Sequence, residues 1–254
     1  MYYLFDGTYA GFLSGVFESF ERKERAVIPM TATLYHQADF FRESRQVYTD
    51  TGKAERVQLG LQRLLGGERA LDFFRVFLSE DPAAWLAAFG IIRRVFEQGA
   101  AILDNYGDED TRYFALTLKK VSRERHRMKA FIRFQKSSDG AYFALIEPDF
   151  NVLPLIAGFF KARYADQAWL IYDVRRQYGL WYDTHSLEEV RMAAAQGSEL
   201  SATAVTITLD EKEEHFQALW KQYYSSTTIA ARKNLKLHVQ HVPKRYWRYL
   251  TEKK

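Results

Sequence analysis

The sequence predicts an α+β protein with a helical N-terminal part, a central antiparallel sheet of ββαββ type and C-terminal helices. Apolar residues recur at helical spacing over most of residues 8–126, the pattern changes to alternation at Met128, and helical spacing returns after Asp210. Helices and strands that are segregated along the chain are typical of the α+β class. We therefore expect three closely packed regions, which are a helix-rich region over 1–118, a sheet region over 119–209 and a basic helical region over 210–254.

The helix-rich region opens with a short predicted strand. The apolar run Tyr2–Phe5 ends at an Asp-Gly turn, and Thr8 is a suitable N-cap for a helix whose apolar residues recur every three or four positions. Residues 26–50 show no clear period, and within them only 46–48 has the character of a strand.

Helical spacing then extends over residues 53–98. Asp81 followed by Pro82 is a favourable N-cap and first residue for the last helix of this stretch. A further helix is predicted from about Asp110 toward His126.

The sheet region is predicted from the change of period at Met128. Ala130, Ile132 and Phe134 alternate with other residues, which indicates a strand, and a turn at 137–140 joins it to a second strand. A helix and a second hairpin follow. These predicted elements are strand 142–146, helix 152–160, strands 169–174 and 178–182, and a β-branched run at 201–209 that forms an edge or closing strand.

The C-terminal region begins with a helix-capping pattern. Asp210 and Glu213 have the spacing of a capping box, and apolar residues follow at helical spacing. Pro243 interrupts the shorter helical pieces near the end of the chain.

Positive charge is concentrated in two segments of a chain whose net charge is only +4. Residues 119–136 hold eight Lys or Arg against one Glu, and residues 221–254 hold nine against one Glu. The rest of the chain is therefore acidic. An acidic body with two basic segments predicts a polyanionic partner.

The chain has no cysteine, which excludes disulfides, thiolate zinc sites, iron–sulfur clusters and cysteine nucleophiles. The N-terminal residues lack the features of a secretory signal, and the charge-free stretch 26–38 is shorter than the ~18 to 20 residues of a membrane span. We therefore expect a cytoplasmic protein that crosses no membrane.

The C-terminal basic segment alternates cations with aromatic rings and hydroxyl groups. Phosphates accept hydrogen bonds from Arg, Lys, Ser, Thr and Asn, and exposed rings stack on unpaired bases, so this combination suits a nucleic acid. The alternative is that the rings belong to the core and the cations to a solvated helix face. The predicted nucleic-acid-binding residues here are Tyr224, Ser226, Thr227, Arg232, Asn234, Lys236, His241, Lys244, Arg245, Tyr246 and Trp247.

The first basic segment adds Arg125, Arg127, Lys129 and Arg133 to the predicted binding residues. On the predicted strand, Arg127, Lys129 and Arg133 share one face, and a basic sheet face can follow a phosphate backbone. An ordinary solvated face of an antiparallel sheet explains the same pattern equally well.

Metal-dependent and nucleotide-dependent catalysis have weak support in the sequence. The candidate metal ligands are the histidines His215, His238 and His241, which lack a zincin-like pattern, and the acids at predicted strand ends, Glu147, Asp149, Asp173 and Asp183. The two acids that flank Pro148 also suit a turn and a helix cap. The sequence holds no motif for phosphate binding, dinucleotide binding or a serine nucleophile. We therefore predict no metal, no cofactor and no catalytic residue.

Three stretches of the sequence resemble a family of bacterial proteins described as DNA-metabolism or DNA-repair proteins. They are FDGTYAGFLSGVFESF, EPDFNVLPLIAGFFKARYADQAWLIYDVRRQYGLWYD and FQALWKQYYSSTTIAARKNLKLHVQHVPKRYWRYLTE. Members of this family carry a domain of unknown function that also occurs ahead of uracil-DNA-glycosylase-like domains, and stand-alone members are associated with a radical-SAM protein. The resemblance implies work on DNA, and it supplies no catalytic residue. Its polar positions coincide with the C-terminal basic segment.

We therefore expect an accessory protein that binds single-stranded or lesion-bearing DNA and presents it to a separate radical-SAM or glycosylase-like protein. A radical-SAM enzyme needs three thiolates for its cluster, so a chain without cysteine is not that enzyme. A DNA-processing enzyme such as a lyase or glycosylase is the alternative, and a protein-interaction adaptor is a third hypothesis.

Overall fold

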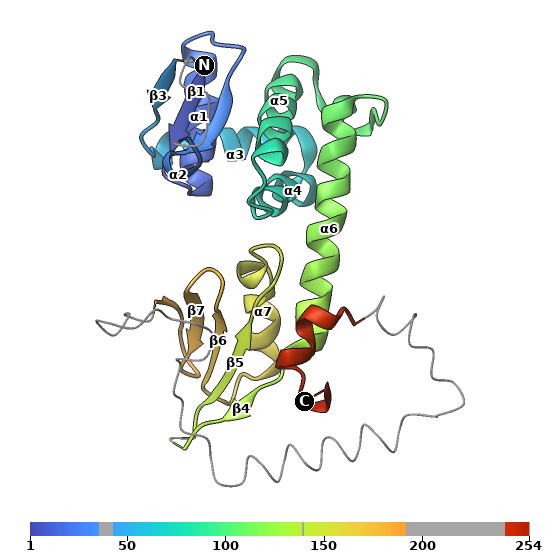
Figure 1. Cartoon of the computed structure of the whole chain (residues 1–254). Helices are drawn as coiled ribbons and strands as arrows, with labels where there is room; N and C mark the ends of the chain where they lie inside the picture. Colours follow the sequence, from blue (N-terminus) through green and yellow to red (C-terminus); the bar gives the residue numbers. More distant parts are fainter. Residues whose placement is uncertain (36–42, 139, 192–241, 254) are drawn as a thin grey trace. The chain divides into compact units, whose positions relative to one another are not determined.

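A computed structural model describes residues 1–35, 43–138, 140–191 and 242–253 of the chain (Figure 1). The chain divides into two compact units, residues 1–122 and 123–254, and the boundary lies inside one long helix, α6 (Glu109–Phe131). The predicted strand at 201–209 and the predicted helix after Asp210 lie outside the described residues. The α+β class is confirmed, because helices accompany two separate sheets.

The first unit contains a small parallel sheet with strand order β2-β1-β3. Its elements are β1 (Tyr2–Phe5), α1 (Tyr9–Glu21), β2 (Ile28–Thr31), α2 (Ala32–Tyr35) and β3 (Ser44–Gln46). Helix α1 is the crossover that a parallel pair requires between β1 and β2. The predicted strand at the N-terminus is confirmed. Strand β2 was not predicted, since four residues that include Pro29 carry no visible alternation.

Helices complete the first unit. They are α3 (Thr51–Leu65), α4 (Gly67–Phe77), α5 (Pro82–Gln98), the 3-10 turn η1 (Ala100–Asp104) and the start of α6. The two caps predicted for this unit, Thr8 of α1 and Asp81 of α5, are confirmed. The side chains of Thr8 and Asp81 accept hydrogen bonds from the backbone N–H groups of Gly11 and Ala83. A cluster of rings joins the helices to the sheet in the core, where Phe5 contacts Phe12 and Trp85 edge to face.

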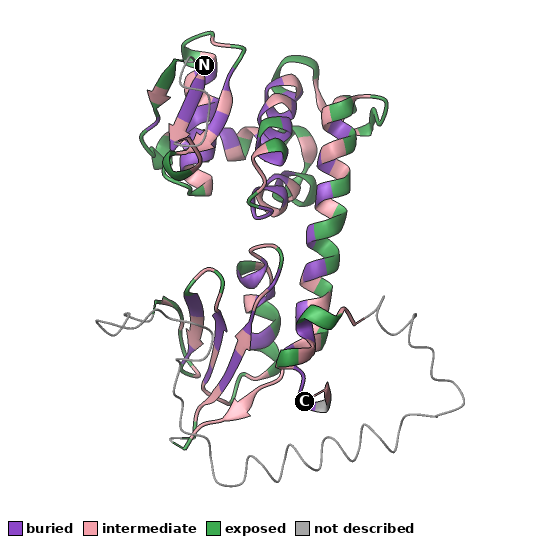
Figure 2. Cartoon of the chain, in the orientation of Figure 1, coloured by how far each residue is buried: buried purple, intermediate pink, exposed green. Residues whose placement is uncertain are grey.

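The second unit is built on a five-stranded sheet of order β4-β5-β6-β7-β8. The elements after α6 are β4 (Gln135–Lys136), β5 (Tyr142–Ile146), α7 (Leu153–Arg163), β6 (Trp169–Asp173), β7 (Tyr178–Tyr182), β8 (Leu187–Val190) and the 3-10 turns η3 (Lys244–Tyr249) and η4 (Thr251–Lys253). The central strands are largely buried (Figure 2). Strand β8 exposes Glu188 and Glu189, and such charges protect an edge strand from further pairing.

Two details of the predicted sheet are wrong. The sheet is not purely antiparallel, because β5 and β6 are parallel, with Phe143 opposite Leu170, and α7 is their crossover. The predicted strand that began at Met128 is instead the last turn of α6, and only Gln135 and Lys136 join the sheet. Arg127, Lys129 and Arg133 therefore do not share the face of a strand.

Candidate functional site

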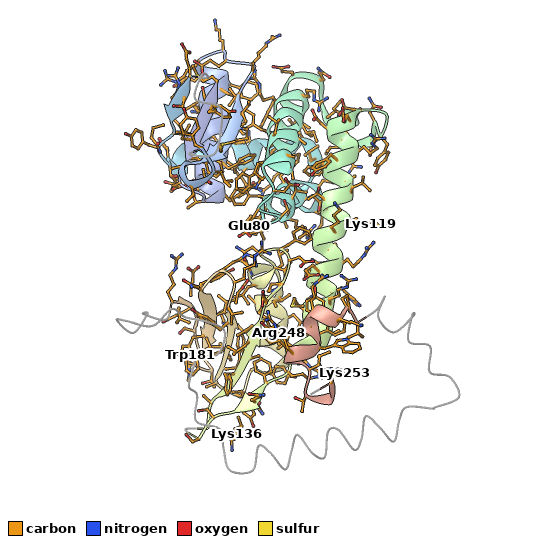
Figure 3. The ribbon with its side chains drawn as sticks, viewed as in Figure 1. Glu80, Lys119, Lys136, Trp181, Arg248 and Lys253 are labelled. Atoms are coloured by element: carbon orange, nitrogen blue, oxygen red, sulfur yellow. The ribbon has the colours of Figure 1, made fainter. Side chains whose placement is uncertain are left out.

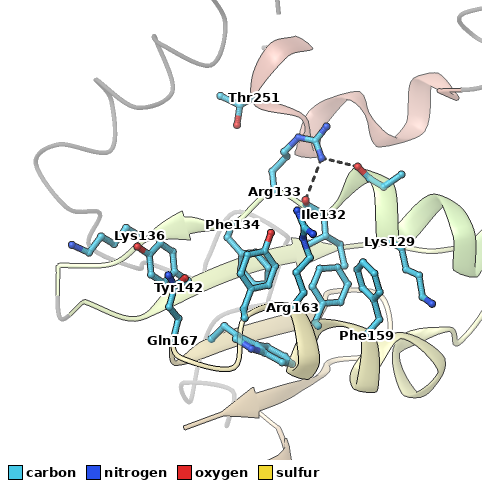
Figure 4. A pocket seen from close by; sticks show the side chains of 14 residues that line it. Lys129, Ile132, Arg133, Phe134, Lys136, Tyr142, Phe159, Arg163, Gln167 and Thr251 are labelled. Atoms are coloured by element: carbon cyan, nitrogen blue, oxygen red, sulfur yellow. Dashed lines mark hydrogen bonds between the residues drawn. The ribbon is translucent and has the colours of Figure 1, made fainter. Parts of the chain in front are cut away.

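A pocket of about 670 Å³ opens in the second unit, where β5 and β6 begin and α7 ends. Its walls come from the end of α6, the segment leading into β4, the last turns of α7 and Thr251 of η4. Aromatic rings and cations dominate the lining, which includes Phe134, Tyr142, Phe159, Phe160, Tyr164, Trp169, Lys129, Arg133, Lys136 and Arg163 (Figure 4). Among the described residues that line it, none is Asp or Glu.

The aromatic wall is a packed cluster around Phe134. The ring centroid of Phe134 lies 5.7 Å from that of Phe160, 5.3 Å from that of Tyr164 and 6.2 Å from that of Trp169. Phe160 and Trp169 are buried, and Phe134 and Tyr164 are half-buried, so the cluster is partly core. Phe159 is more open, because it remains 38% exposed while its neighbour Phe160 is buried. The wall therefore presents an exposed ring on a packed base.

Two of the lining cations have no acidic partner in the described part of the chain. Lys129 Nζ lies 4.8 Å from the ring centroid of Phe159, and Arg163 Cζ lies 5.7 Å from that of Tyr164. Neither cation forms an ion pair with a described residue. Arg133 donates from Nη1 to the carbonyl oxygens of Ala130 and Ile132, which orients its guanidinium at the pocket (Figure 4). The pocket is therefore positively charged, and part of that charge is available to an anion.

A buried hydrogen-bond donor also lies in the wall. Trp169 is 1% exposed, and its indole Nε1 has no hydrogen-bond partner among the described residues. Buried polar groups are nearly always paired, because desolvation of an unpaired donor costs free energy.

A second polar cluster surrounds the buried side chain of Glu124 on α6. Its carboxylate accepts hydrogen bonds from the hydroxyl of Tyr246 and from the backbone N–H of Asp149, the latter at 3.0 Å. Arg245 Nη2 lies 3.3 Å from Glu124 and 2.5 Å from the carboxylate of Asp149. Burial, together with the hydrogen bond to Glu124, raises the pKa of Tyr246, so its hydroxyl stays a donor.

Other acids near the ends of β5 and β6 are paired in the same way. Glu147 forms an ion pair with Arg248 of η3 (Figure 3) and accepts a hydrogen bond from the hydroxyl of Tyr249 at 2.8 Å. Asp173 is fully buried, and Arg176 Nη1 donates to it at 2.8 Å. Charge pairs of this kind satisfy buried carboxylates and fasten η3 to the sheet.

Comparison with protein-family models matches residues 82–252 to DUF4130, a domain of unknown function. The chain belongs to the DUF4130 family. The match covers the whole described part of the second unit except Lys253, so both polar sites belong to the DUF4130 domain. No curated protein matches the chain.

The DUF4130 domain brings only some of the predicted binding residues together. Lys129 and Arg133 line the pocket, whereas Arg127, Arg245 and Tyr246 contact Glu124. The other described residues of the predicted set are Arg125, Lys244 and Trp247. Arg125 forms no ion pair with a described residue, and Lys244 is exposed. Trp247 donates a hydrogen bond from Nε1 to the carbonyl oxygen of Val242. The predicted residues outside the described part are Tyr224, Ser226, Thr227, Arg232, Asn234, Lys236 and His241.

The described acids do not form a metal site. Within the described residues, no group of three His, Cys, Asp or Glu side chains is placed to hold a metal ion. Asp183 instead accepts hydrogen bonds from the backbone N–H groups of His185 and Ser186. The histidines His215, His238 and His241 lie outside the described residues.

Sequence reasoning missed the partners that complete the pocket. Phe159 was assigned to a predicted helix and Trp169 to a predicted strand, without a functional role, and Arg163 and Tyr164 were assigned to neither. Their basic and aromatic character nevertheless matches that of the predicted segments. Separately, none of the described helices combines the length and apolar character needed to cross a lipid bilayer.

Proposed function

We propose that this protein binds DNA through the pocket of the DUF4130 domain, as an accessory protein of DNA repair or DNA metabolism. The observation that carries the proposal is the lining of that pocket, where four cations and six aromatic rings meet with no acidic residue among the described lining. Cations position phosphates, and aromatic rings stack on bases. The resemblance of the sequence to DNA-repair proteins supports DNA as the polyanion.

The cations of the pocket differ from those near Glu124, and this difference supports the pocket as the binding surface. Arg245, Arg248 and Arg176 already neutralise carboxylates of their own domain. Lys129 and Arg163 have no such partner in the described part of the chain, so binding a phosphate does not require them to break an ion pair. The pocket is therefore a better phosphate site than the cluster around Glu124.

A separate catalytic protein, of the radical-SAM or glycosylase-like kind, is part of the same proposal. Its support is the resemblance of the sequence and the pairing of Glu147 and Asp173 with arginines, which leaves these acids poorly placed for catalysis. Incubation of the full chain with lesion-bearing oligonucleotides should therefore yield no product. Turnover by the chain alone would favour an enzyme instead.

Binding is tested with the full chain and a fluorescein-labelled single strand in a salt titration monitored by anisotropy. Each phosphate neutralised on a single strand contributes a slope of about −0.7 to log affinity against log salt, so four contacts predict about −3. A slope near zero, or no binding at low salt, would overturn the proposal.

A further inference from the structure

We infer that the pocket receives one unpaired nucleotide of a single strand, whose base stacks on the ring of Phe159, an inference that rests on the DNA binding proposed above. The features that support it are the accessible ring of Phe159, the two cations that form no ion pair with a described residue and the size of the pocket.

The chemistry of the wall selects among ligands. A purely apolar ligand would desolvate Lys129 and Arg163 without compensation. A simple inorganic anion would satisfy the cations and leave the aromatic wall without a partner. A nucleotide has both complementary parts, because it combines a flat base with a phosphate.

The geometry of the pocket selects an unpaired nucleotide. In a duplex, the faces of each base are covered by its neighbours and its pairing edge by its partner, so a base can enter a pocket only from a single strand or after it leaves the stack. The volume of about 670 Å³ lies within the range of roughly 300–1,000 Å³ typical of small-ligand pockets. Phe159 offers the accessible ring for stacking, beside Lys129.

The test compares two strands of equal charge with the full chain. One is a 15-nucleotide oligothymidylate, and the other is a strand of the same length made only of abasic sites. We expect the abasic strand to bind about tenfold more weakly or worse, because stacking is lost while the phosphates remain. Equal affinities would overturn base insertion and leave the proposed DNA binding intact. Failure of both strands to bind would instead overturn the proposed function.

Free nucleotides are tested as competitors, since they have the same chemistry as a nucleotide in a strand. Thymidine monophosphate should displace the oligothymidylate only weakly, because it provides one phosphate and no neighbouring contacts. If the mononucleotide binds more tightly than the oligothymidylate, the pocket serves free nucleotides and the single-strand inference is wrong.

Trp181→Phe is a control variant for the binding experiments, because Trp181 lies on β7 and does not line the pocket (Figure 3). It should change the affinity for neither strand.

Phe159→Leu tests the stacking of a base directly. Phe159 is partly exposed, so leucine should preserve the fold, which the melting temperature checks, while it removes the stacking ring. We expect the preference for oligothymidylate over the abasic strand to fall about tenfold. A folded Phe159→Leu variant with the wild-type preference would show that no base stacks at this wall.

Discussion

The hydroxyl of Tyr246 donates a hydrogen bond to the carboxylate of Glu124, a residue 122 positions earlier in the chain. Glu124 is 1% exposed, and Tyr246 is buried beside it. This contact fastens η3 to α6 within the second unit. Tyr246 belongs to the basic C-terminal segment, and this contact gives it a structural role. Such a role is the alternative to nucleic-acid binding that the sequence left open for the rings of that segment.

Replacement of Tyr246 by Phe should destabilise the protein by about 1–3 kcal/mol, because the buried Glu124 carboxylate loses a donor that no water replaces. Urea unfolding measures the loss. Tyr249→Phe is the matched control, since Tyr249 donates to Glu147, whose side chain is 35% exposed and can be hydrated. The loss for the control should be below about 1 kcal/mol. Equal losses in the two variants would contradict the importance that we assign to the burial of Glu124.

The same contact explains why the sequence did not predict the end of α6. The inward face of this helix includes Val121, Glu124 and Met128, which are all buried. A charged residue on that face interrupts the apolar period, and its partner Tyr246 is distant in the sequence. The alternation of Ala130, Ile132 and Phe134 was therefore mistaken for a strand.

Elsewhere, features that depend on residues close together in the sequence were predicted correctly. Features that depend on residues far apart in the sequence were not. The caps at Thr8 and Asp81 were predicted because a cap involves residues two or three positions apart. The parallel pairing of β5 with β6 is a non-local property that the individual strands do not encode. For the same reason, charge density indicated Lys129, but only the fold brings Trp169 to the same pocket.

Two glycines of the second unit should respond to alanine in opposite directions. A Cβ at Gly179 on β7 would lie 2.8 Å from the carbonyl oxygen of Ile171, a backbone atom that cannot move away cheaply. Gly179→Ala should therefore cost about 1–3 kcal/mol. A Cβ at Gly158 on α7 would meet no neighbouring atom within 4 Å, so Gly158→Ala should stabilise the helix by about 0.5–1 kcal/mol. Denaturant titration measures both, and a stabilising Gly179→Ala would show that β7 and β6 are less closely packed than this distance implies.

Acid should weaken the first unit through Asp108. The Arg94 guanidinium at 2.6 Å and the backbone N–H of Thr111 lower the pKa of Asp108 to about 2. An unfolded chain has an Asp pKa of about 3.9, so the stabilising effect of the ionised carboxylate is complete above about pH 4. It is lost as the pH falls from about 4 to about 2.

The variant Asp108→Asn isolates this effect. It should be less stable than the wild type at pH 6, and the difference in unfolding free energy should shrink toward zero near about pH 2. Glu55→Gln is the control, because Glu55 is exposed and has no ion pair among the described residues. If the difference in unfolding free energy between the wild type and Asp108→Asn stays constant from pH 6 to about pH 2, the charge of Asp108 does not have the role that we assign to it.

The paired cation variant tests where the phosphates bind. Lys129→Gln with Arg163→Gln keeps two polar side chains of similar length and removes the two lining cations that have no acidic partner in the described part of the chain. Each lost phosphate contact on a single strand releases about 0.7 fewer counterions, so the salt slope should become shallower by about one to two units. The charge-matched control is Lys119→Gln with Lys120→Gln, which removes two exposed cations of α6 that do not line the pocket. Its slope should stay close to that of the wild type, because long-range charge alone is screened within about 10 Å at 0.1 M salt. Identical slope changes for the two double variants would mean that net charge attracts the DNA, and that the pocket does not hold its phosphates.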